Sequence, residues 1–214
     1  MFNSAKALVF DMDGTMIANK EFHDKAWIQF CEKYRQDANI DDFINKYSGK
    51  TNDAILAFVF NRTLSEAEIR MFEDIKESMY REMYAPHFKL VDGLIALLEK
   101  AKQSGLKIAI ATSAPRVNVD FVCEKANIGK YFDTIVDSSM VSEGKPNPEV
   151  FLKAAKALGV EPSDCICFED SRAGIAASIV AGMKTIGIAT ELSVDELLSL
   201  GAHEAYVDFT VYSR

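Results

Sequence analysis

The chain has 214 residues, of which 49% are hydrophobic, so it can bury the core of one α/β domain with a small insertion. Its 24 basic and 32 acidic residues give a formal charge of −8, which argues against a nucleic-acid partner. A small anion remains a feasible ligand, provided that a metal ion and one or two lysines reverse the field locally.

The four cysteines show no C-x-x-C spacing, and two of them, Cys165 and Cys167, lie in an apolar run. Such cysteines are predicted to be free, buried thiols of a reducing compartment. The first residues lead into an apolar strand pattern without the longer apolar segment of a signal peptide, and no stretch is long enough to cross a bilayer. The sequence therefore predicts a cytoplasmic protein without a membrane partner, and we expect a monomer.

The first structural signal is a short apolar run at residues 7–10, which predicts a buried strand and is followed by Asp11-Met12-Asp13-Gly14-Thr15. Two carboxylates a few Å apart repel each other by about 4 kcal/mol at an effective dielectric constant near 20. A divalent cation would remove this repulsion, and a positive φ at Gly14 would let both carboxylates point into one pocket. An ordinary acidic turn is the alternative for this peptide taken alone.

Residues 17–84 show helical periodicity and no convincing strand. In the first helix, apolar residues recur every four positions: Phe22, Ala26, Phe30 and Tyr34. A second helix is predicted to begin at the capping box Ser65-Glu66-Ala67-Glu68. It continues with an apolar stripe that we interpret as packing: Phe72, Ile75, Met79 and Met83.

From residue 86 onward, helix and strand patterns alternate, which is typical of a parallel sheet. Helices are predicted at 94–101, 150–158 and 173–181. Strands are predicted at 106–111, 165–168 and 184–188. Because the first strand precedes the helical segment and the other strands follow it, the helices are predicted to be inserted into an α/β core, above the ends of the strands.

Ligands of open α/β sheets bind outside the carboxyl ends of the strands, and three strand ends here carry polar side chains. These are Asp11 and Asp13, Thr112 and Ser113, and Glu169-Asp170-Ser171, while a proline-stiffened loop places Lys145 just before a helix. Each piece alone has an ordinary interpretation as a helix cap, a solvated turn or an exposed lysine. Together, four carboxylates, two hydroxyls and one lysine at one sheet edge match the needs of an aspartyl-phosphate mechanism.

These four segments, in this order, resemble the four motifs of the haloacid dehalogenase superfamily of phosphotransferases, and the resemblance covers nearly the whole chain. It implies a Rossmann-like core of residues 1–16 and 85–214, with a helical cap domain of residues 17–84. This arrangement is similar to the subclass that includes β-phosphoglucomutase and many sugar-phosphate phosphatases. In the cap, Glu21–Trp27 is similar to the histidine-containing first cap helix of the mutase group, and Gly49 to its specificity-loop glycine.

The resemblance implies that Asp11 is the nucleophile and that Asp13 is the general acid and base. It implies that Thr112, with the backbone amides of Ser113 and Ala114, holds the phosphoryl oxygens. Lys145 would neutralise the charge of the nucleophile and of the phosphoryl group.

The same resemblance implies a Mg²⁺ ion, a hard cation that prefers oxygen ligands. Its implied ligands are the carboxylates of Asp11, Glu169 and Asp170 and the backbone carbonyl of Asp13. Members of the family with a second carboxylate farther along the chain carry it where Gly174 stands here. We infer that Glu169 takes its place.

The cap supplies further candidates for substrate binding. The resemblance implies that His23 orients Asp13 when the cap closes, and a helix histidine without such a role is the alternative. Gly49, Lys50 and Asn52 lie on a candidate substrate loop. Lys76 is in reach of a substrate beside the apolar stripe, although a solvated helix lysine is its more ordinary interpretation.

Mutases of this group carry an arginine, for a second phosphate, where Asn52 stands here. Asparagine lacks the charge and the bidentate fork of arginine, so the sequence favours a Mg²⁺-dependent phosphatase over a mutase. The expected substrate is a small phosphorylated metabolite such as a sugar or polyol phosphate, and β-phosphoglucomutase activity is the alternative. A receiver-like phosphoacceptor module is a further alternative, but receivers carry the acidic pair and the phosphoacceptor on different strands, whereas Asp11 and Asp13 follow one.

Overall fold

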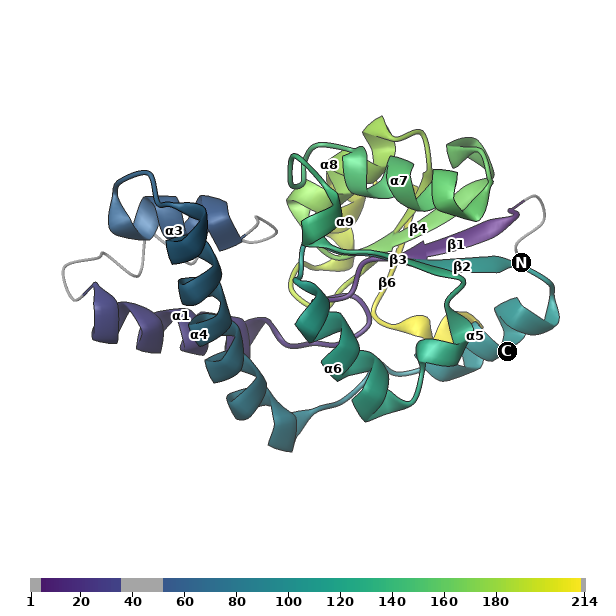
Figure 1. The fold of residues 1–214 in the computed structure, drawn as a ribbon. Coiled ribbons are helices and arrows are strands. Elements are labelled where there is room, and N and C mark those ends of the chain that lie inside the picture. Colours follow the sequence, from purple (N-terminus) through teal and green to yellow (C-terminus); the bar gives the residue numbers. More distant parts are fainter. Residues whose placement is uncertain (1–4, 36–51, 213–214) are drawn as a thin grey trace.

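The computed structural model describes residues 5–35 and 52–212. Within them, parallel strands form one sheet in the order β3-β2-β1-β4-β5-β6 (Figure 1). The strands are β1 Ala7–Phe10, β2 Lys107–Ala111, β3 Thr134–Val136, β4 Cys165–Glu169, β5 Lys184–Ile188 and β6 Glu204–Tyr206. β1 is central because it pairs with both β2 and β4, with Phe10 opposite Ile110 and Phe168. The strand order reverses beside β1, which is where such sheets form a ligand crevice.

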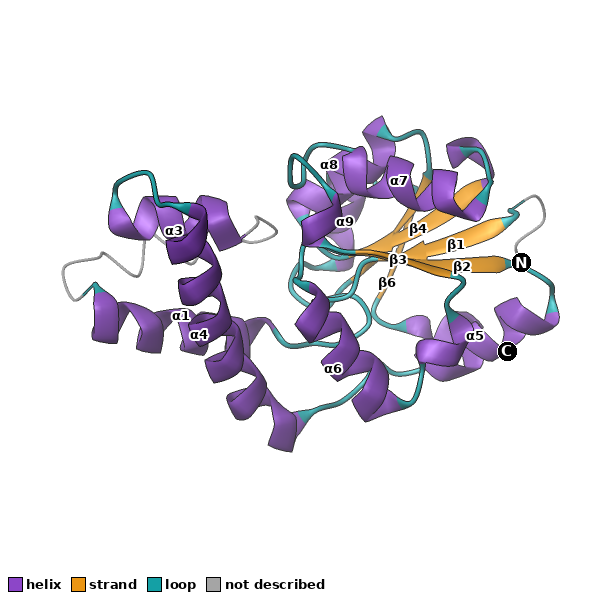
Figure 2. Ribbon diagram, viewed as in Figure 1, coloured by secondary structure: helices purple, strands orange, loops and turns teal. Residues whose placement is uncertain are grey.

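Helices cover both faces of the sheet (Figure 2). They are α5 Leu94–Gln103, α6 Arg116–Ala126, α7 Glu149–Leu158, α8 Arg172–Val180 and α9 Val194–Ser199. Alternate residues of β1 face opposite layers: Leu8 packs in the apolar cluster that contains Leu97 of α5, and Val9 packs in the one that contains Phe151 of α7. A strand that is buried on both faces shows a continuous apolar run, which explains the sequence of β1.

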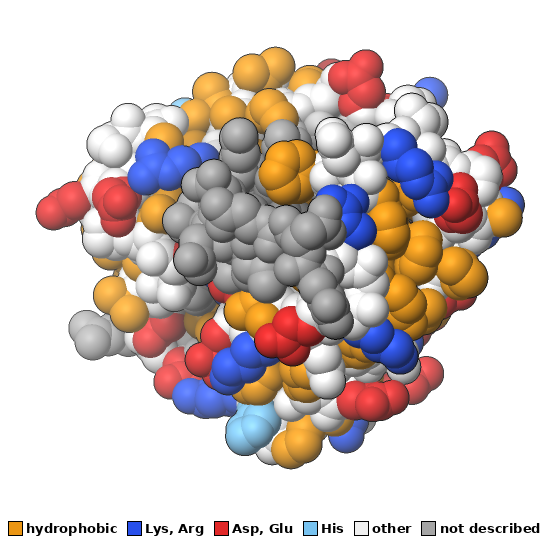
Figure 3. Space-filling model, turned by 90° about the vertical axis from the view of Figure 1, so that its left-hand side faces the viewer, with side chains coloured by type: hydrophobic (Ala, Val, Ile, Leu, Met, Phe, Trp, Pro, Cys, Tyr) orange, Lys and Arg blue, Asp and Glu red, His pale blue; other side chains and the backbone are white. Residues whose placement is uncertain are grey.

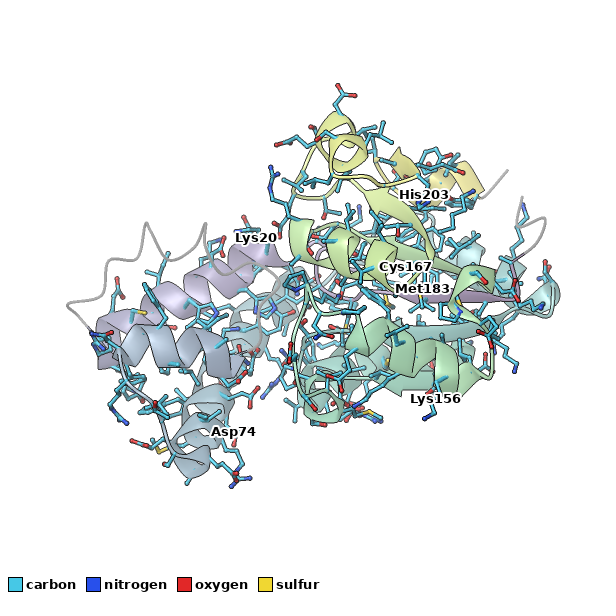
Figure 4. All side chains as sticks on the ribbon, turned by 90° about the horizontal axis from the view of Figure 1, so that it is seen from above. Lys20, Asp74, Lys156, Cys167, Met183 and His203 are labelled. Atoms are coloured by element: carbon cyan, nitrogen blue, oxygen red, sulfur yellow. The ribbon has the colours of Figure 1, made fainter. Side chains whose placement is uncertain are left out.

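The inserted helices lie beside this core as a separate unit (Figure 1). They are α1 Lys20–Tyr34, α3 Asn52–Phe60 and α4 Glu66–Tyr84. They share their own apolar cluster: Trp27, Phe30, Cys31, Ile55, Leu56, Val59, Leu64 and Phe72. Lys20 lies where α1 joins the core, whereas Asp74 lies on the outer side of the helical unit (Figure 4). The α/β core with an inserted helical cap confirms the predicted fold class.

The two connections between core and cap run side by side. Ile17 forms a bridge with Leu90, and the N–H of Val91 donates to the carbonyl of Met16. These contacts lie close to the predicted domain boundaries at 16/17 and 84/85, which stay a prediction. A hinge at two adjacent connections would let the cap move as one body.

Several predicted elements have their expected bounds. The strands at 7–10 and 184–188 match, the strand predicted at 165–168 extends to Glu169, and Ser65 caps α4 with the reciprocal bond to Glu68. β3 and β6 have three residues each, too few to show a periodic pattern, and no strand was predicted there.

On the face at the cap end, basic and acidic side chains of the described residues lie interspersed (Figure 3). Across residues 5–35 and 52–212, none of the helices has the length and apolar content of a membrane span.

Candidate active site

The neighbouring strands β1 and β4 bring the first and last acidic motifs together. Asp11 directly follows β1, Glu169 ends β4, and Asp170 comes next. All three side chains are buried, and each offers a carboxylate oxygen within 4.8 Å of the others. Carboxylates that are 158 residues apart in the sequence therefore form one acidic cluster, which is defined as Asp11, Glu169 and Asp170.

Lys145 lies between two of these acids. Its Nζ donates to Asp11 Oδ1 at 2.5 Å and to Glu169 Oε1 at 2.7 Å. Burial alone would lower the pKa of Lys145, but the two carboxylates outweigh it and raise the pKa, so the side chain stays an ammonium. The lysine reaches the cluster from the loop before α7, and the structure brings it to the first aspartate as the sequence predicts.

One ammonium cannot neutralise three buried carboxylates. Burial raises the pKa of Asp11 to about 7 and that of Asp170 well above its usual range, and in both cases neighbouring carboxylates add to the shift. The groups in the cluster are oxygen donors, the kind that hard divalent cations prefer. The unmet negative charge and the donor set therefore fit a bound Mg²⁺ ion.

Two glycines make room for the acidic cluster. Gly14 has a φ of +80°, and a Cβ at this position would collide with the Asp170 carboxylate. A Cβ at Gly174 would collide with the Glu169 carboxylate. Glu169 thus fills the space that a side chain at 174 would need, which supports the inference that it replaces an acid there.

Glu169 also organises the start of α8. Its Oε2 accepts hydrogen bonds from the backbone N–H groups of Asp170 and Ser171 and from the Ser171 hydroxyl. Asp170 Oδ1 in turn accepts from the Thr15 hydroxyl at 3.0 Å. These bonds fix the carboxylates in place. The role of Glu169 as a metal ligand stays a prediction.

Asp13 has a different environment from Asp11, although they are two residues apart. Its carboxylate turns toward the cap, where Oδ1 accepts from Asn19 Nδ2 at 2.6 Å and lies 3.7 Å from His23 Nε2. Asn19 Nδ2 also donates to the Tyr80 hydroxyl at 2.6 Å. One aspartate is therefore held by a lysine of the core and the other by an amide at the cap entrance.

His23 and Lys76 meet above Asp13. Lys76 Nζ lies 2.8 Å from His23 Nδ1 and donates to Glu77 Oε1 at 2.8 Å. Lys76 is 2% exposed, so its interpretation as a solvated helix lysine is wrong. Because an ammonium can only donate, His23 Nδ1 must accept, and the ring hydrogen is on Nε2. Within the described residues this buried Nε2 makes no hydrogen bond, and it faces Asp13.

One pocket between core and cap collects the candidate residues that the structure describes. The predicted residues that line it are Asp11, Asp13, His23, Asn52, Lys76, Thr112, Ser113, Lys145, Glu169 and Asp170. The predicted loop residues Gly49 and Lys50 lie outside the described residues. Thr112, whose Oγ1 accepts from the Ala114 N–H, thus shares a pocket with the acidic cluster, as phosphate binding would require.

The sequence did not predict four other residues that contact the site: Asn19, Glu77, Tyr80 and Asn118. Asn19 precedes α1 at the position of a helix cap, which gave no hint of its bond to Asp13. Glu77 follows Lys76 beside the apolar stripe of its helix, and this pair of adjacent charged residues is the sequence feature that could have identified it. Asn118 lies on α6, a helix that was not predicted.

Comparisons with known proteins agree with this geometry. A sequence model described as "Haloacid dehalogenase-like hydrolase" matches residues 8–188. Protein CbbY of Rhodobacter capsulatus is 33% identical over 85% of this chain and 84% of the relative. Beta-phosphoglucomutase of Bacillus subtilis is 31% identical over 86% of this chain and 83% of the relative. A phosphorylated carbohydrates phosphatase of Thermotoga maritima is 27% identical over 92% of both chains.

A solved structure is similar over nearly its whole length. It is a HAD hydrolase of family IA, variant 3, from Entamoeba histolytica, with a TM-score of 0.86 and 33% identity. The match covers 96% of this chain and 94% of the other. The chain therefore belongs to the haloacid dehalogenase-like hydrolases and is an enzyme of their phosphatase and phosphotransferase type.

Proposed function

We propose that this enzyme is a Mg²⁺-dependent phosphatase of a small phosphorylated metabolite and that Asp11 carries the phosphoryl group as an aspartyl phosphate. The observation that carries the proposal is the buried Asp11, held at 2.5 Å by Lys145 in a pocket that Thr112 and Ser113 also line. A nucleophile, its counter-charge and phosphate-binding groups thus face one space. Asp11, Glu169, Asp170 and the Asp13 carbonyl would hold a Mg²⁺ ion, and the bound ion would neutralise the charge of the phosphoryl oxygens.

The two aspartates divide the reaction between them. Asp11 attacks phosphorus and displaces the substrate oxygen, which takes a proton from Asp13. Asp13 then removes a proton from the water that hydrolyses the aspartyl phosphate. Its carboxylate is the one aimed at the cap, where the leaving group would lie, and it is held there by Asn19 and faced by His23.

The surroundings of Asn52 support hydrolysis over mutase chemistry. Asn52 is 9% exposed, and its Nδ2 donates to Glu73 Oε1 at 3.1 Å and to Glu77 Oε1 at 2.7 Å. A second phosphate at this position would meet two carboxylates and no guanidinium fork. β-Phosphoglucomutase activity is the second candidate, favoured by the relative of that name.

The rest of the pocket suits a sugar or polyol phosphate. Trp27, Ile55 and Pro115 offer apolar surface, and Asn52 offers an amide. Such a mixture fits the hydroxyls and the C–H faces of a neutral leaving group. The predicted monomeric state and cytoplasmic location stay predictions.

A panel of phosphorylated metabolites, assayed with Mg²⁺ and then with excess chelator, tests the function. We expect phosphate release that needs Mg²⁺ and that falls at least about 10³-fold in the Asp11→Asn variant. Undiminished release by that variant would remove Asp11 as the nucleophile. If the enzyme instead interconverts glucose phosphates faster than it releases phosphate, the mutase alternative holds.

A further inference from the structure

Glu77 connects elements of the cap and the core. It lies on α4 and is 1% exposed. Its Oε1 accepts from Lys76 and Asn52, both in the cap, and its Oε2 accepts from Asn118 Nδ2 of the core helix α6 at 2.6 Å. The bond to Asn118 is therefore a buried, charge-assisted contact between cap and core.

Asn118 is clamped between opposite charges. Its side chain is fully buried, and its Oδ1 accepts from Arg81 Nη1 at 2.8 Å while its Nδ2 donates to Glu77. Glu77 and Arg81 are one turn apart on α4, so they flank the amide on one helix face. A reversed amide would set oxygen against carboxylate and NH₂ against guanidinium, so its orientation is fixed.

A series of side-chain contacts connects Asn118 and Glu77 with the reacting groups. Glu77 pairs with Lys76, Lys76 bonds to His23, and the Nε2 of His23 faces Asp13. The cap thus contacts the core at Asn118 and also at Asp13, and the adjacent α4 residues Glu77 and Lys76 connect these two contacts. Moving Asn118 away from Glu77 would disturb the charge that holds Lys76 and, through it, His23.

We propose that Asn118 is a positioning residue that holds the cap closed through Glu77 and thereby sets Lys76 and His23 against Asp13. This inference rests on the proposed function, because it assigns Asp13 the proton transfers. Loss of one hydrogen bond to a buried carboxylate should shift the closed-to-open equilibrium about 10- to 100-fold.

Asn118→Asp tests the proposal because it keeps the shape of the side chain and places a carboxylate against Glu77. We expect a larger radius of gyration in X-ray scattering with Mg²⁺ and beryllium fluoride, and a kcat for p-nitrophenyl phosphate that is about 10- to 100-fold lower. Asn127→Asp is the matched control, since Asn127 is exposed at the other end of α6. It should leave both quantities unchanged.

A donor-acceptor exchange gives the rescue. In the double variant Glu77→Gln/Asn118→Asp, Gln donates to Asp, Asp accepts from Arg81, and the net charge is conserved. We expect the double variant to have the radius of gyration of the wild type. Its kcat should be at least about tenfold higher than that of Asn118→Asp. No recovery of scattering would overturn the inference, as would Asn118→Asp scattering identical to that of the control.

A variant of His23 separates positioning from a general loss of structure. In a His23→Ala background, Asn118→Asp should lower kcat less than twofold further, because the connection to Asp13 is already cut. A full additional loss would indicate a merely structural role and overturn the proposal. If the wild type releases no phosphate from any compound, the proposed function fails, whereas the scattering comparison still decides whether Asn118 holds the cap.

Discussion

Two buried sites in this enzyme combine carboxylates with a lysine, but the pKa of the carboxylate is raised in one site and lowered in the other. In the acidic cluster, Lys145 pairs with two of the three carboxylates, and burial with mutual repulsion raises the pKa of Asp11 to about 7. In the cap, burial alone would also raise the pKa of Glu77, but the Lys76 ammonium and the hydrogen bonds from Lys76 and Asn118 outweigh it and lower the pKa to about 2. The number of carboxylates that share one ammonium, and not burial alone, decides which site holds unmet charge.

This difference matches the two roles we propose. The acidic cluster holds carboxylates that a bound cation would stabilise, as a catalytic site requires. Glu77 accepts three hydrogen bonds, from Lys76 and Asn52 on Oε1 and from Asn118 on Oε2, and the bond from Lys76 is also an ion pair. A carboxylate satisfied in this way suits a fixed structural connection. Removing counter-charge should therefore affect the two sites differently.

The largest effect is expected at Lys145. Lys145→Met would leave Asp11 and Glu169 without their ammonium, which should lower kcat about 10²- to 10³-fold and destabilise the Mg²⁺-free protein by about 3–5 kcal/mol. Phosphate-release assays and urea unfolding measure the two effects. Lys153→Met is the matched control, because Lys153 pairs with Glu149 at the surface and should cost less than about 1 kcal/mol. Equal unfolding free energies for the two variants would contradict the account of the cluster.

Mg²⁺ should stabilise the wild type by binding the acidic cluster. At a Mg²⁺ concentration 100 times the dissociation constant, the free energy of unfolding should rise by about 2.7 kcal/mol. This gain corresponds to roughly 5–10 °C in Tm for a chain of this size. Asp170→Asn should abolish the gain, whereas Asp164→Asn, at a half-buried acid that pairs with Lys6 away from the cluster, should keep it. Thermal unfolding with and without Mg²⁺ measures both, and an unchanged gain in Asp170→Asn would place the ion elsewhere.

The smallest expected effect is the pH dependence at Glu77. Its pKa falls from 4.5 to about 2 on folding, so its stabilising contribution is present above pH 4.5 and is lost as pH falls toward 2. The stability advantage of the wild type over Glu77→Gln should therefore shrink by about 2 kcal/mol between pH 7 and pH 3. Urea unfolding at both pH values measures it. An advantage that is the same at both values would show that Glu77 is not held ionised.

The sequence predicted most of the core site because its signals are local. An apolar strand that ends in acids identifies Asp11, and the same logic identifies Asp170, since parallel strands end at one sheet edge. The cap contacts could not be predicted in this way. Asn118 and Glu77 are 41 residues apart on two elements whose packing depends on how the cap meets the core. Lys76 is buried by tertiary packing, which a helical pattern does not reveal.

The most direct test of the central claim is to find where the phosphoryl group resides during turnover. The enzyme would be mixed with Mg²⁺ and substrate, quenched in acid within milliseconds to seconds, digested, and mapped by mass spectrometry. We predict a phosphoryl group on Asp11 that disappears in the Asp11→Asn variant. Steady turnover with the phosphoryl group on another carboxylate, or a phosphorylated peptide that persists in that variant, would contradict the account.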